Sequence, residues 1–290
     1  MDRNRSRRTT LGPDEAFVFS QSALQDYADC QRRFQLRYLQ QVRWPAPQTE
    51  PLKENEEHIL RGERFHRLAQ QALLGVPLDR LDAIVAADPD EALPRWWHSF
   101  TALLPTLTPA SAALSVETRL GAPFQHHRLI AQYDLVQVFA ADKRAVIWDW
   151  KTSLARPRRT ALEARLQSII YPYIFARSSA GLNQGSPFLP DQIEMVYWFT
   201  EFPEQPERFV NDTTRFARAE ARLLSLVSEI ESLRADQFEK TPDEKACRFC
   251  VYRSLCARGS EAGSLAELES DLETSDDIEI NFDQIGEISF

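Results

Sequence analysis

Two hydrophobic spacings alternate along this chain of 290 residues. Up to about residue 107, apolar side chains recur every three to four positions, as they do on the buried face of an α-helix. From Ala113 to Thr152 the spacing shortens to two, which is typical of strands that bury one face and expose the other. Helical spacing returns after Arg156 and is interrupted by one further strand-like run. Helices that pack on a sheet of such strands predict an α/β fold.

The predicted elements follow from this spacing and from capping and turn residues. The helices are expected from Ser20 or Ser22 to about Leu39, from about Glu54 to Leu74, within 78–107, from Arg156 to about Ala176, and from Thr214 to Gln237. The strands are expected at Leu114–Leu120, Arg128–Val138, Ala145–Lys151 and Ile193–Thr200. Turns are predicted at 121–123 and 141–143, an extended linker at Pro45, Pro47 and Pro51, and a kink or break near Pro172. The helical stretch within 78–107 predicts a subdomain or lid, inserted at about 76–112.

Charged residues are distributed unevenly along the chain, whose formal net charge is -9. Residues 260–290 hold ten acidic and no basic side chains, so the rest of the chain carries 34 basic and 33 acidic groups. This composition predicts a disordered acidic tail at 260–290, through which a protein partner could be engaged. Residues 1–16 predict a disordered basic arm with four arginines, Arg3, Arg5, Arg7 and Arg8. A nearly neutral body is compatible with nucleic-acid binding, because local basic clusters matter more than the sum.

The four cysteines are placed in a way that suggests a metal or cluster site. No apolar run reaches the roughly 18 residues of a membrane span, and we expect a cytoplasmic protein in a reducing compartment, where disulfides are rare. Cys247, Cys250 and Cys256 form a C-x2-C-x5-C motif, and Cys30 stands far from them in the sequence. Zinc accepts four thiolates, and so does a cubane iron–sulfur cluster. Spacing alone leaves three alternatives open: zinc, a cluster, or a Cys30 that is only a small core residue.

A pair of carboxylates and a lysine end two of the predicted strands. Asp149 and Lys151 close one run, and Asp134 closes the run before it. Side chains alternate faces along a strand, so Asp149 and Lys151 are expected on the same side. Carboxylates bind hard divalent cations, and a lysine can orient a water or steady the charge growing on a phosphate. This set is typical of a metal-dependent hydrolase.

These motifs together resemble the PD-(D/E)XK nuclease superfamily over roughly 19–258. The similarity is greatest to the RecB-like branch that includes AddB-type nuclease domains and the iron–sulfur exonucleases of CRISPR adaptation. The motifs occur in the order of that family: Ser20-Gln-Ser22-Ala-Leu24-x-x-Tyr27-x-x-Cys30 with Phe34 and Tyr38, Gly62-Glu-Arg-Phe-His66, Asp134, Asp149-Trp-Lys151, Gln167-x-x-x-Tyr171 and Cys247-x2-Cys250-x5-Cys256. The resemblance implies a restriction-endonuclease-like mixed sheet flanked by helices, in one domain at 17–259 whose cysteine segment, about 245–258, is stapled by the cluster.

The resemblance also implies roles for individual residues. His66, Asp134 and Asp149 would bind Mg²⁺ or Mn²⁺, helped by the backbone carbonyl of Trp150, and Lys151 would be catalytic. Imidazole suits Mn²⁺ better than Mg²⁺. Gln167 and Tyr171 would lie near the scissile strand, and the four cysteines would bind a [4Fe-4S] cluster, with zinc as the alternative metal.

The resemblance predicts a metal-dependent DNA nuclease. We expect an exonuclease that acts on single-stranded DNA or on a DNA end, in repair, recombination or CRISPR adaptation. The alternative is a nuclease-fold subunit that binds DNA or serves as a scaffold. Three departures from the family pattern, Gln31, Ala131 and the aspartate at 149, leave the subfamily open. Glu117, on the first predicted strand, is a candidate neighbour of the site that we do not include among the predicted site residues.

Overall fold

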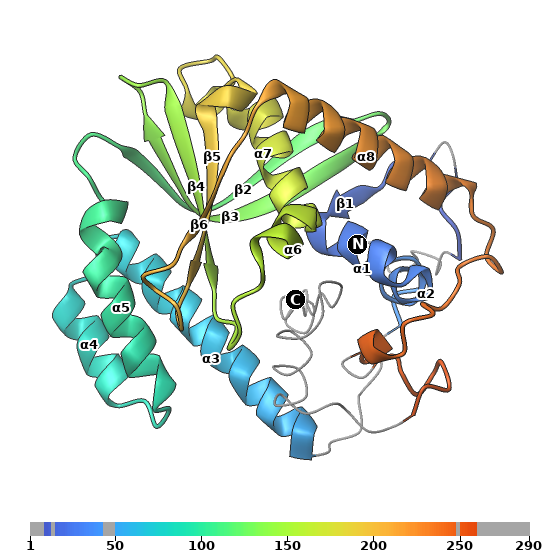
Figure 1. The fold of residues 1–290 in the computed structure, drawn as a ribbon, viewed down its shortest axis with the longest axis horizontal. Coiled ribbons are helices and arrows are strands. Elements are labelled where there is room, and N and C mark those ends of the chain that lie inside the picture. Colours follow the sequence, from blue (N-terminus) through green and yellow to red (C-terminus); the bar gives the residue numbers. More distant parts are fainter. Residues whose placement is uncertain (1–8, 13–14, 43–49, 248–249, 260–290) are drawn as a thin grey trace, which may run out of the picture.

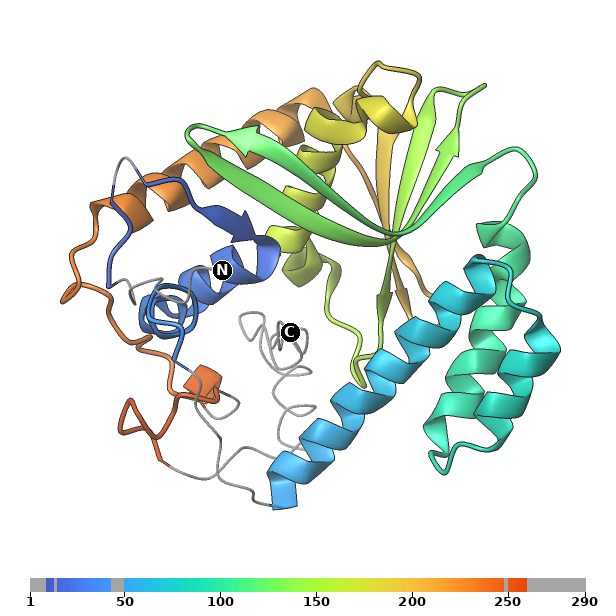
Figure 2. The same cartoon turned by 180° about the vertical axis from the view of Figure 1, so that it is seen from behind.

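The computed structural model describes residues 9–12, 15–42, 50–247 and 250–259. Within this part, a six-stranded mixed sheet carries helices on both faces (Figure 1, and from behind in Figure 2). The predicted α/β fold, a mixed sheet flanked by helices, is therefore confirmed. No helix in the described ranges is both long enough and apolar enough to cross a membrane.

Four strands of the sheet were predicted from the spacing of two, and two short ones were not. The strands are β1 (Val18–Ser20), β2 (Ala113–Phe124), β3 (His127–Phe139), β4 (Arg144–Lys151), β5 (Ile193–Phe199) and β6 (Glu207–Val210). β1 pairs with β3 in parallel and β4 pairs with β5 in parallel, while the other pairs are antiparallel. β1 and β6 escape prediction because three or four residues are too few for a period of two to be seen.

Strand β3 has two different neighbours along one of its edges. β2 pairs with β3 along its length and occupies the other edge. β1 pairs only with 128–130 and β4 only with 135–139. The stretch 131–134 of β3 therefore pairs with neither β1 nor β4 on that edge. We call this place, between the ends of β1 and β4, the fork.

The helices lie in two groups, one on each face of the sheet (Figures 1 and 2). The larger helices are α1 (Gln21–Asp29), α3 (Glu50–Leu73), α4 (Leu78–Ala86), α5 (Ala92–Leu107), α7 (Leu166–Ser178) and α8 (Thr213–Ser232). The shorter segments are α2 (Gln31–Phe34), a π-helical turn η1 (Gln35–Leu39), α6 (Arg159–Ala164) and the 3₁₀ turns η2 (Ser179–Leu182), η3 (Pro190–Gln192) and η4 (Lys245–Cys247). Two helix starts are capped by side chains, since Ser20 accepts the N–H of Ala23 and Asp212 accepts that of Arg215.

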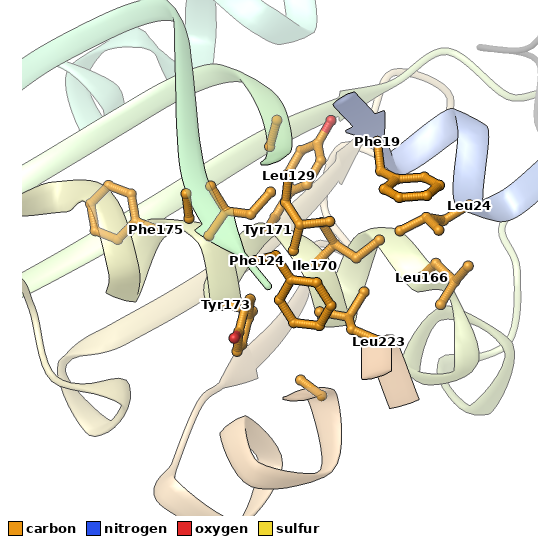
Figure 3. Close-up of a cluster of buried hydrophobic side chains, with 14 of the residues drawn as sticks. Phe19, Leu24, Phe124, Leu129, Leu166, Ile170, Tyr171, Tyr173, Phe175 and Leu223 are labelled. Carbon is orange, nitrogen blue, oxygen red and sulfur yellow. The ribbon is translucent and has the colours of Figure 1, made fainter. Parts of the chain in front are cut away.

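One face of the sheet packs against α1, α7 and α8 (Figure 3). Leu129 of β3 meets Phe19 of β1, Ile170 of α7 and Leu223 of α8, and each of these four side chains is fully buried. The alternate residues of the same strands point to the other face. This face therefore fixes α7 at the edge of the fork.

The opposite face packs against α3, α4 and α5. Trp148 and Trp150 of β4 and Trp198 of β5 belong to one buried cluster with Phe65 of α3 and Phe100 of α5. The ring centroids of Phe65 and Trp198 are 6.1 Å apart, and those of Phe100 and Trp150 are 5.5 Å apart. The helices of the predicted insertion, α4 and α5, thus cover a face of the sheet and pack against α3 beside the fork.

Two predicted helices are broken in the structure. The helix predicted from Ser20 or Ser22 to Leu39 stops at Cys30, whose backbone is extended with φ -162° and ψ 107°. The helix predicted from Arg156 to Ala176 is interrupted at Arg165 instead of near Pro172, which lies inside α7. Gln167 and Tyr171, four residues apart in the predicted motif, both lie on α7.

Other boundaries differ as well. The turn predicted at 121–123 lies inside β2, and β2 and β3 are joined at 125–126. Pro51 belongs to the first turn of α3, where a proline costs no hydrogen bond. Leu11 is buried in the core, N-terminal to the predicted domain boundary at 17. Pro45 and Pro47, the arginines at 3–8 and the acidic tail lie outside the described residues.

Candidate active site

A pocket of about 650 Å³ opens at the fork. β3 and β4 contribute one side of it, and α3 and α7 contribute two others. Its lining contains every residue that sequence reasoning placed in the catalytic set: His66, Asp134, Asp149, Trp150, Lys151, Gln167 and Tyr171. The structure thus brings together side chains separated by more than one hundred positions.

Asp134 links the two strands of the fork to α3. Its Oδ2 accepts the backbone N–H of Trp150 at 2.7 Å, which takes the place of a ladder bond where β3 and β4 part. Its Oδ1 lies 3.4 Å from Nδ1 of His66. Because the N–H and C=O of one strand residue point to the same side, the Trp150 carbonyl lies on the side of β4 that faces Asp134.

Glu117 joins this group, although sequence reasoning assigned it no role. The β2–β3 register places it directly opposite Asp134. Its φ is 46°, in the left-handed region that residues other than glycine rarely occupy. Burial, and then the neighbouring Asp134 carboxylate, raise the pKa of Glu117. One ligand atom each from His66, Glu117 and Asp134 lie within 4.8 Å of one another, so these three residues could hold one divalent cation.

The position of the hairpin turn was the signal that could have identified Glu117. A turn at 121–123 shifts the expected register, whereas the observed turn at 125–126 brings Glu117 opposite Asp134. Gln132, two residues before Asp134 on β3, donates a hydrogen bond of 2.8 Å to Oε2 of Glu117. Arg119 in turn donates to Gln132 at 3.3 Å. The Glu117 carboxylate is therefore oriented by neighbouring side chains.

Asp149, Lys151 and Gln167 form a closed triangle beside this group. The Lys151 ammonium lies 2.9 Å from Oδ2 of Asp149 and donates to Oε1 of Gln167 at 2.8 Å. Gln167 donates from Nε2 to Oδ1 of Asp149 at 2.6 Å. All three side chains are buried, with 5 % of Asp149 exposed. The predicted placement of Asp149 and Lys151 on one side of β4 is confirmed, and Asp149 contacts Lys151 and Gln167.

Tyr171 lies one turn beyond Gln167 on α7. Its carbonyl accepts the hydroxyl of Tyr133 at 2.9 Å, and the two rings are 5.0 Å apart. Only 8 % of Tyr171 is exposed. The contact with Tyr133, which lies between Gln132 and Asp134 on β3, fixes α7 relative to the fork.

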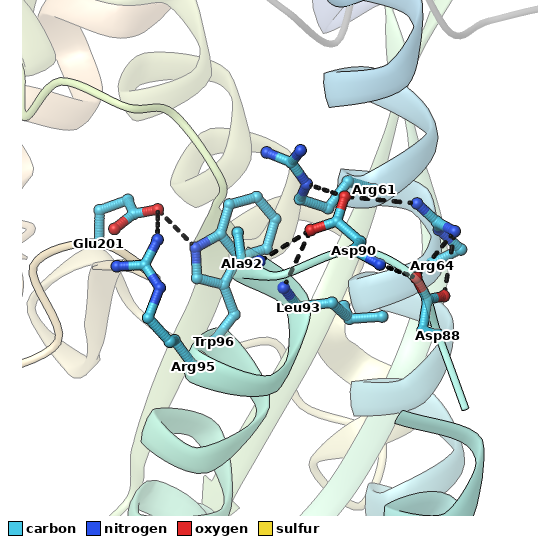
Figure 4. Close-up of polar contacts among 9 residues, drawn as sticks. All are labelled: Arg61, Arg64, Asp88, Asp90, Ala92, Leu93, Arg95, Trp96 and Glu201. Carbon is cyan, nitrogen blue, oxygen red and sulfur yellow. Dashed lines mark hydrogen bonds and ion pairs between the residues drawn. The ribbon is translucent and has the colours of Figure 1, made fainter. Parts of the chain in front are cut away.

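A network of ion pairs holds α3 in place (Figure 4). Arg61 pairs with Asp90, and Arg64 pairs with Asp88 at 3.0 Å. Asp90 also accepts the N–H of Ala92 at 2.9 Å at the start of α5. Because both arginines lie within five residues of His66 on α3, these contacts fix the position of His66 relative to the fork.

The approach of α3 to β4 is close at Gly62. A Cβ at this position would lie 2.9 Å from Oγ1 of Thr152, the residue after Lys151. His58, one turn earlier, is also buried against this strand end, and burial followed by the charge of Arg61 lowers its pKa. The glycine of the predicted Gly62-to-His66 motif therefore permits α3 to touch the end of the catalytic strand.

The four cysteines lie away from this pocket as half-buried free thiols. Burial, and then the charges of Cys250, Cys30 and Cys256, raise the pKa of Cys247 to about 11. Burial also raises the pKa of Cys250, while Arg33 lowers it. Cys30 occupies the break between α1 and α2, so the break presents this thiol to the C-terminal segment.

Comparison with known proteins identifies the class of this protein. The model of the PD-(D/E)XK nuclease superfamily matches residues 18–257, most of the chain. The chain belongs to the PD-(D/E)XK nuclease superfamily, as the sequence motifs predicted.

Among solved structures, the chain is similar to the crystal structure of SSO0001, with 12% identity, a TM-score of 0.39, and coverage of 83% of this chain and 87% of that one. It is also similar to a protein of Eubacterium rectale named "Putative exonuclease", with 8% identity, a TM-score of 0.42, and coverage of 72% and 80%. No curated protein sequence matches the chain.

Proposed function

We propose that this protein is a divalent-metal-dependent deoxyribonuclease that removes nucleotides from DNA ends, in the manner of RecB-like exonucleases. The observation that carries the proposal is the pocket at the fork, where a three-residue ligand group stands beside a buried lysine. Family membership supports phosphodiester hydrolysis. The DNA substrate, the exonuclease mode and a role in repair, recombination or CRISPR adaptation are parts of the proposal.

His66, Glu117 and Asp134 are the residues that would hold the metal, with Asp149 and the Trp150 carbonyl on the adjoining strand. Two carboxylates and an imidazole fit Mn²⁺ well and Mg²⁺ less well, so activity should be higher with Mn²⁺. A cation bound there would polarise the phosphodiester and lower the pKa of a water. Glu117 extends the ligand set beyond the three residues that the family resemblance implied.

Lys151 and its partners supply the remaining chemistry. The ammonium is held at the pocket by Asp149 and Gln167, so it is positioned before substrate arrives. A preorganised cation stabilises the charge that develops on the phosphate without reorganisation during the reaction. Since Gln167 bridges Asp149 and Lys151, we assign it the role of orienting both.

The cysteines are proposed to bind a [4Fe-4S] cluster, with zinc as the alternative. Four thiols would supply the four ligands that either group requires. The cluster would join the break at Cys30 to the C-terminal segment. Iron content and visible absorption of anaerobically purified protein distinguish the two metals, and Cys30→Ser should lose the group as completely as Cys250→Ser.

The decisive experiment compares cleavage of end-labelled linear single-stranded DNA with cleavage of circular single-stranded DNA in Mn²⁺. We expect the linear substrate to be degraded and the circular one to persist. Lys151→Met should reduce the rate by on the order of 10²–10³, while Lys143→Met, which removes an exposed lysine from the β3–β4 turn, should leave it unchanged. Full activity of Lys151→Met would contradict the proposed site. DNA binding without cleavage by the wild-type protein would instead favour a scaffolding subunit.

A further inference from the structure

A second groove lies beside α7, and the candidate active site does not use it. Its volume is about 790 Å³, and it is formed by α7, the β6–α8 connection and the first half of α8. Gln167 and Tyr171 of α7 line the active-site pocket, whereas Ser168 and Pro172 of the same helix line this groove. The two openings are therefore neighbours that share one helix.

A row of arginines forms the α8 wall of this groove. Arg215, Arg218 and Arg222 follow one another at spacings of three and four residues, so they occupy one face of the helix. Arg215 pairs with Glu163 across the groove. Arg218 and Arg222 are exposed, and neither makes an ion pair within the part of the chain that the structure describes.

The acidic groups of the groove are already engaged. Glu163 is paired with Arg215, and Asp212 accepts the N–H of Arg215 at 2.6 Å as the cap of α8. Three arginines and two carboxylates line the groove, and neither Arg218 nor Arg222 pairs with a carboxylate among the described residues. The groove is thus locally basic although the whole protein has a net charge of -9.

Aromatic rings lie next to the arginines. Phe216, which is half-buried, lines the groove and stacks on the buried ring of Tyr173, with centroids 4.8 Å apart and an angle of 25°. The Arg177 guanidinium lies 5.4 Å from the centre of the Phe216 ring. Flat aromatic surfaces beside cations are the features on which single-stranded nucleic acids stack and bind without sequence preference.

We propose that this groove binds a single-stranded segment of the nucleic acid whose end is cleaved at the fork, an inference that rests on the proposed function. The arginine row spans seven residues, about 10 Å at 1.5 Å per residue. Charges on one strand of duplex DNA are spaced by roughly 3.4 Å along the helix axis, and a single strand is more extended, so the row is long enough to meet more than one phosphate. The half-buried Phe216 ring beside the arginines favours nucleic acid over an acidic peptide, which has no bases to stack on it.

The test is a double variant, Arg218→Gln with Arg222→Gln, in the full-length protein. The control is Arg80→Gln with Arg234→Gln, which removes the same charge from exposed arginines that do not line the groove. Binding to a single-stranded 30-mer is measured without divalent metal from 50 to 200 mM salt. Loss of two phosphate contacts should reduce the slope of log affinity against log salt concentration by about 1.4. The ratio of wild-type to variant affinity should therefore fall roughly sevenfold from 50 to 200 mM salt.

Cleavage in Mn²⁺ separates this proposal from the proposed function. For the groove variant we expect a higher KM on the 30-mer and unchanged cleavage of a dinucleotide, whose single phosphodiester occupies the fork and leaves no further phosphate for the groove. Equal 30-mer binding and equal salt slopes for the groove variant and the control would overturn the groove. Failure of the wild type to cleave either substrate would overturn the nuclease function, while the binding comparison would still decide the groove.

Discussion

Gly62→Ala puts the contact between α3 and the catalytic strand to a quantitative test. In an exposed helix, alanine in place of glycine stabilises by about 1 kcal/mol. Here the new methyl group would lie 2.9 Å from Oγ1 of Thr152, and Cβ and Cγ2 of the same threonine are at 3.7 and 3.8 Å. One rotation of Thr152 would put its methyl group in place of the hydroxyl, and the other would turn Hβ toward the new methyl group at the cost of changing the packing of the threonine. Overpacking of this kind costs about 1–3 kcal/mol, and we expect a net loss of up to about 2 kcal/mol.

The double variant Gly62→Ala with Thr152→Ala isolates the clash. With Thr152 truncated, the nearest remaining atom is the Cβ at 3.7 Å, an ordinary contact. Gly62→Ala should then stabilise by about 1 kcal/mol, which gives a coupling of about 1–3 kcal/mol between the two sites. Gly181→Ala, where no atom lies within 4 Å of the added Cβ, is the matched control.

Denaturant unfolding measures these free energies, and cleavage in Mn²⁺ measures the consequence for catalysis. Thr152 directly follows Lys151, so its displacement should lower the cleavage rate in Gly62→Ala, and Thr152→Ala should restore much of it. The contact would be refuted if the changes in unfolding free energy of Gly62→Ala and Thr152→Ala add up to that of the double variant within about 0.5 kcal/mol. It would also be refuted if Gly62→Ala is as stable as the Gly181→Ala control.

Two further predictions concern a buried histidine and the triangle at the site. His127 accepts the N–H of Phe17 at Nδ1, and burial lowers its pKa. The unfolded chain therefore takes up a proton below about pH 6.5 that the folded protein resists, and the free energy of unfolding should fall by up to about 1.4 kcal/mol per pH unit below that point. Urea unfolding at several pH values should show a shallower fall for His127→Asn; an equal slope would exclude His127 as the source. Gln167→Ala should lower kcat about 10- to 100-fold with little change in KM, since Gln167 orients Asp149 and Lys151; a raised KM at unchanged kcat would mean that Gln167 binds substrate instead.

The parts of the fold that the sequence predicted are those set by local periodicity. Strands β3, β4 and β5 bury alternate side chains on two different helical layers, and this requirement is visible as a period of two. The same alternation was enough to predict that Asp149 and Lys151 share one side of their strand. The order of the family motifs then predicted which other residues would meet them.

The parts that escaped prediction depend on contacts between distant segments. β1 has three residues and forms because it pairs with one edge of β3, so its own sequence gives little indication of a strand. The break at Cys30 contains neither glycine nor proline. Two residues beyond the break, the Arg32 N–H bonds the carbonyl of Glu239, more than two hundred positions away. Glu117 was assigned no role for a similar reason, because only the register of β2 on β3 shows that it faces Asp134.

At the fork, Asp134 is part of the candidate site and also part of the hydrogen bonding of the sheet. β3 and β4 stop pairing at Trp148, and the next N–H on that edge, that of Trp150, is taken up by the Asp134 carboxylate at 2.7 Å. The residue proposed as a metal ligand therefore also closes the sheet. Removing its side chain would leave a part-buried N–H without an acceptor, which costs about 1–3 kcal/mol, so Asp134→Ala mixes loss of the metal with loss of the fold. Asp134→Asn keeps an oxygen at this position and removes the charge, and it is the substitution that reports on the metal alone.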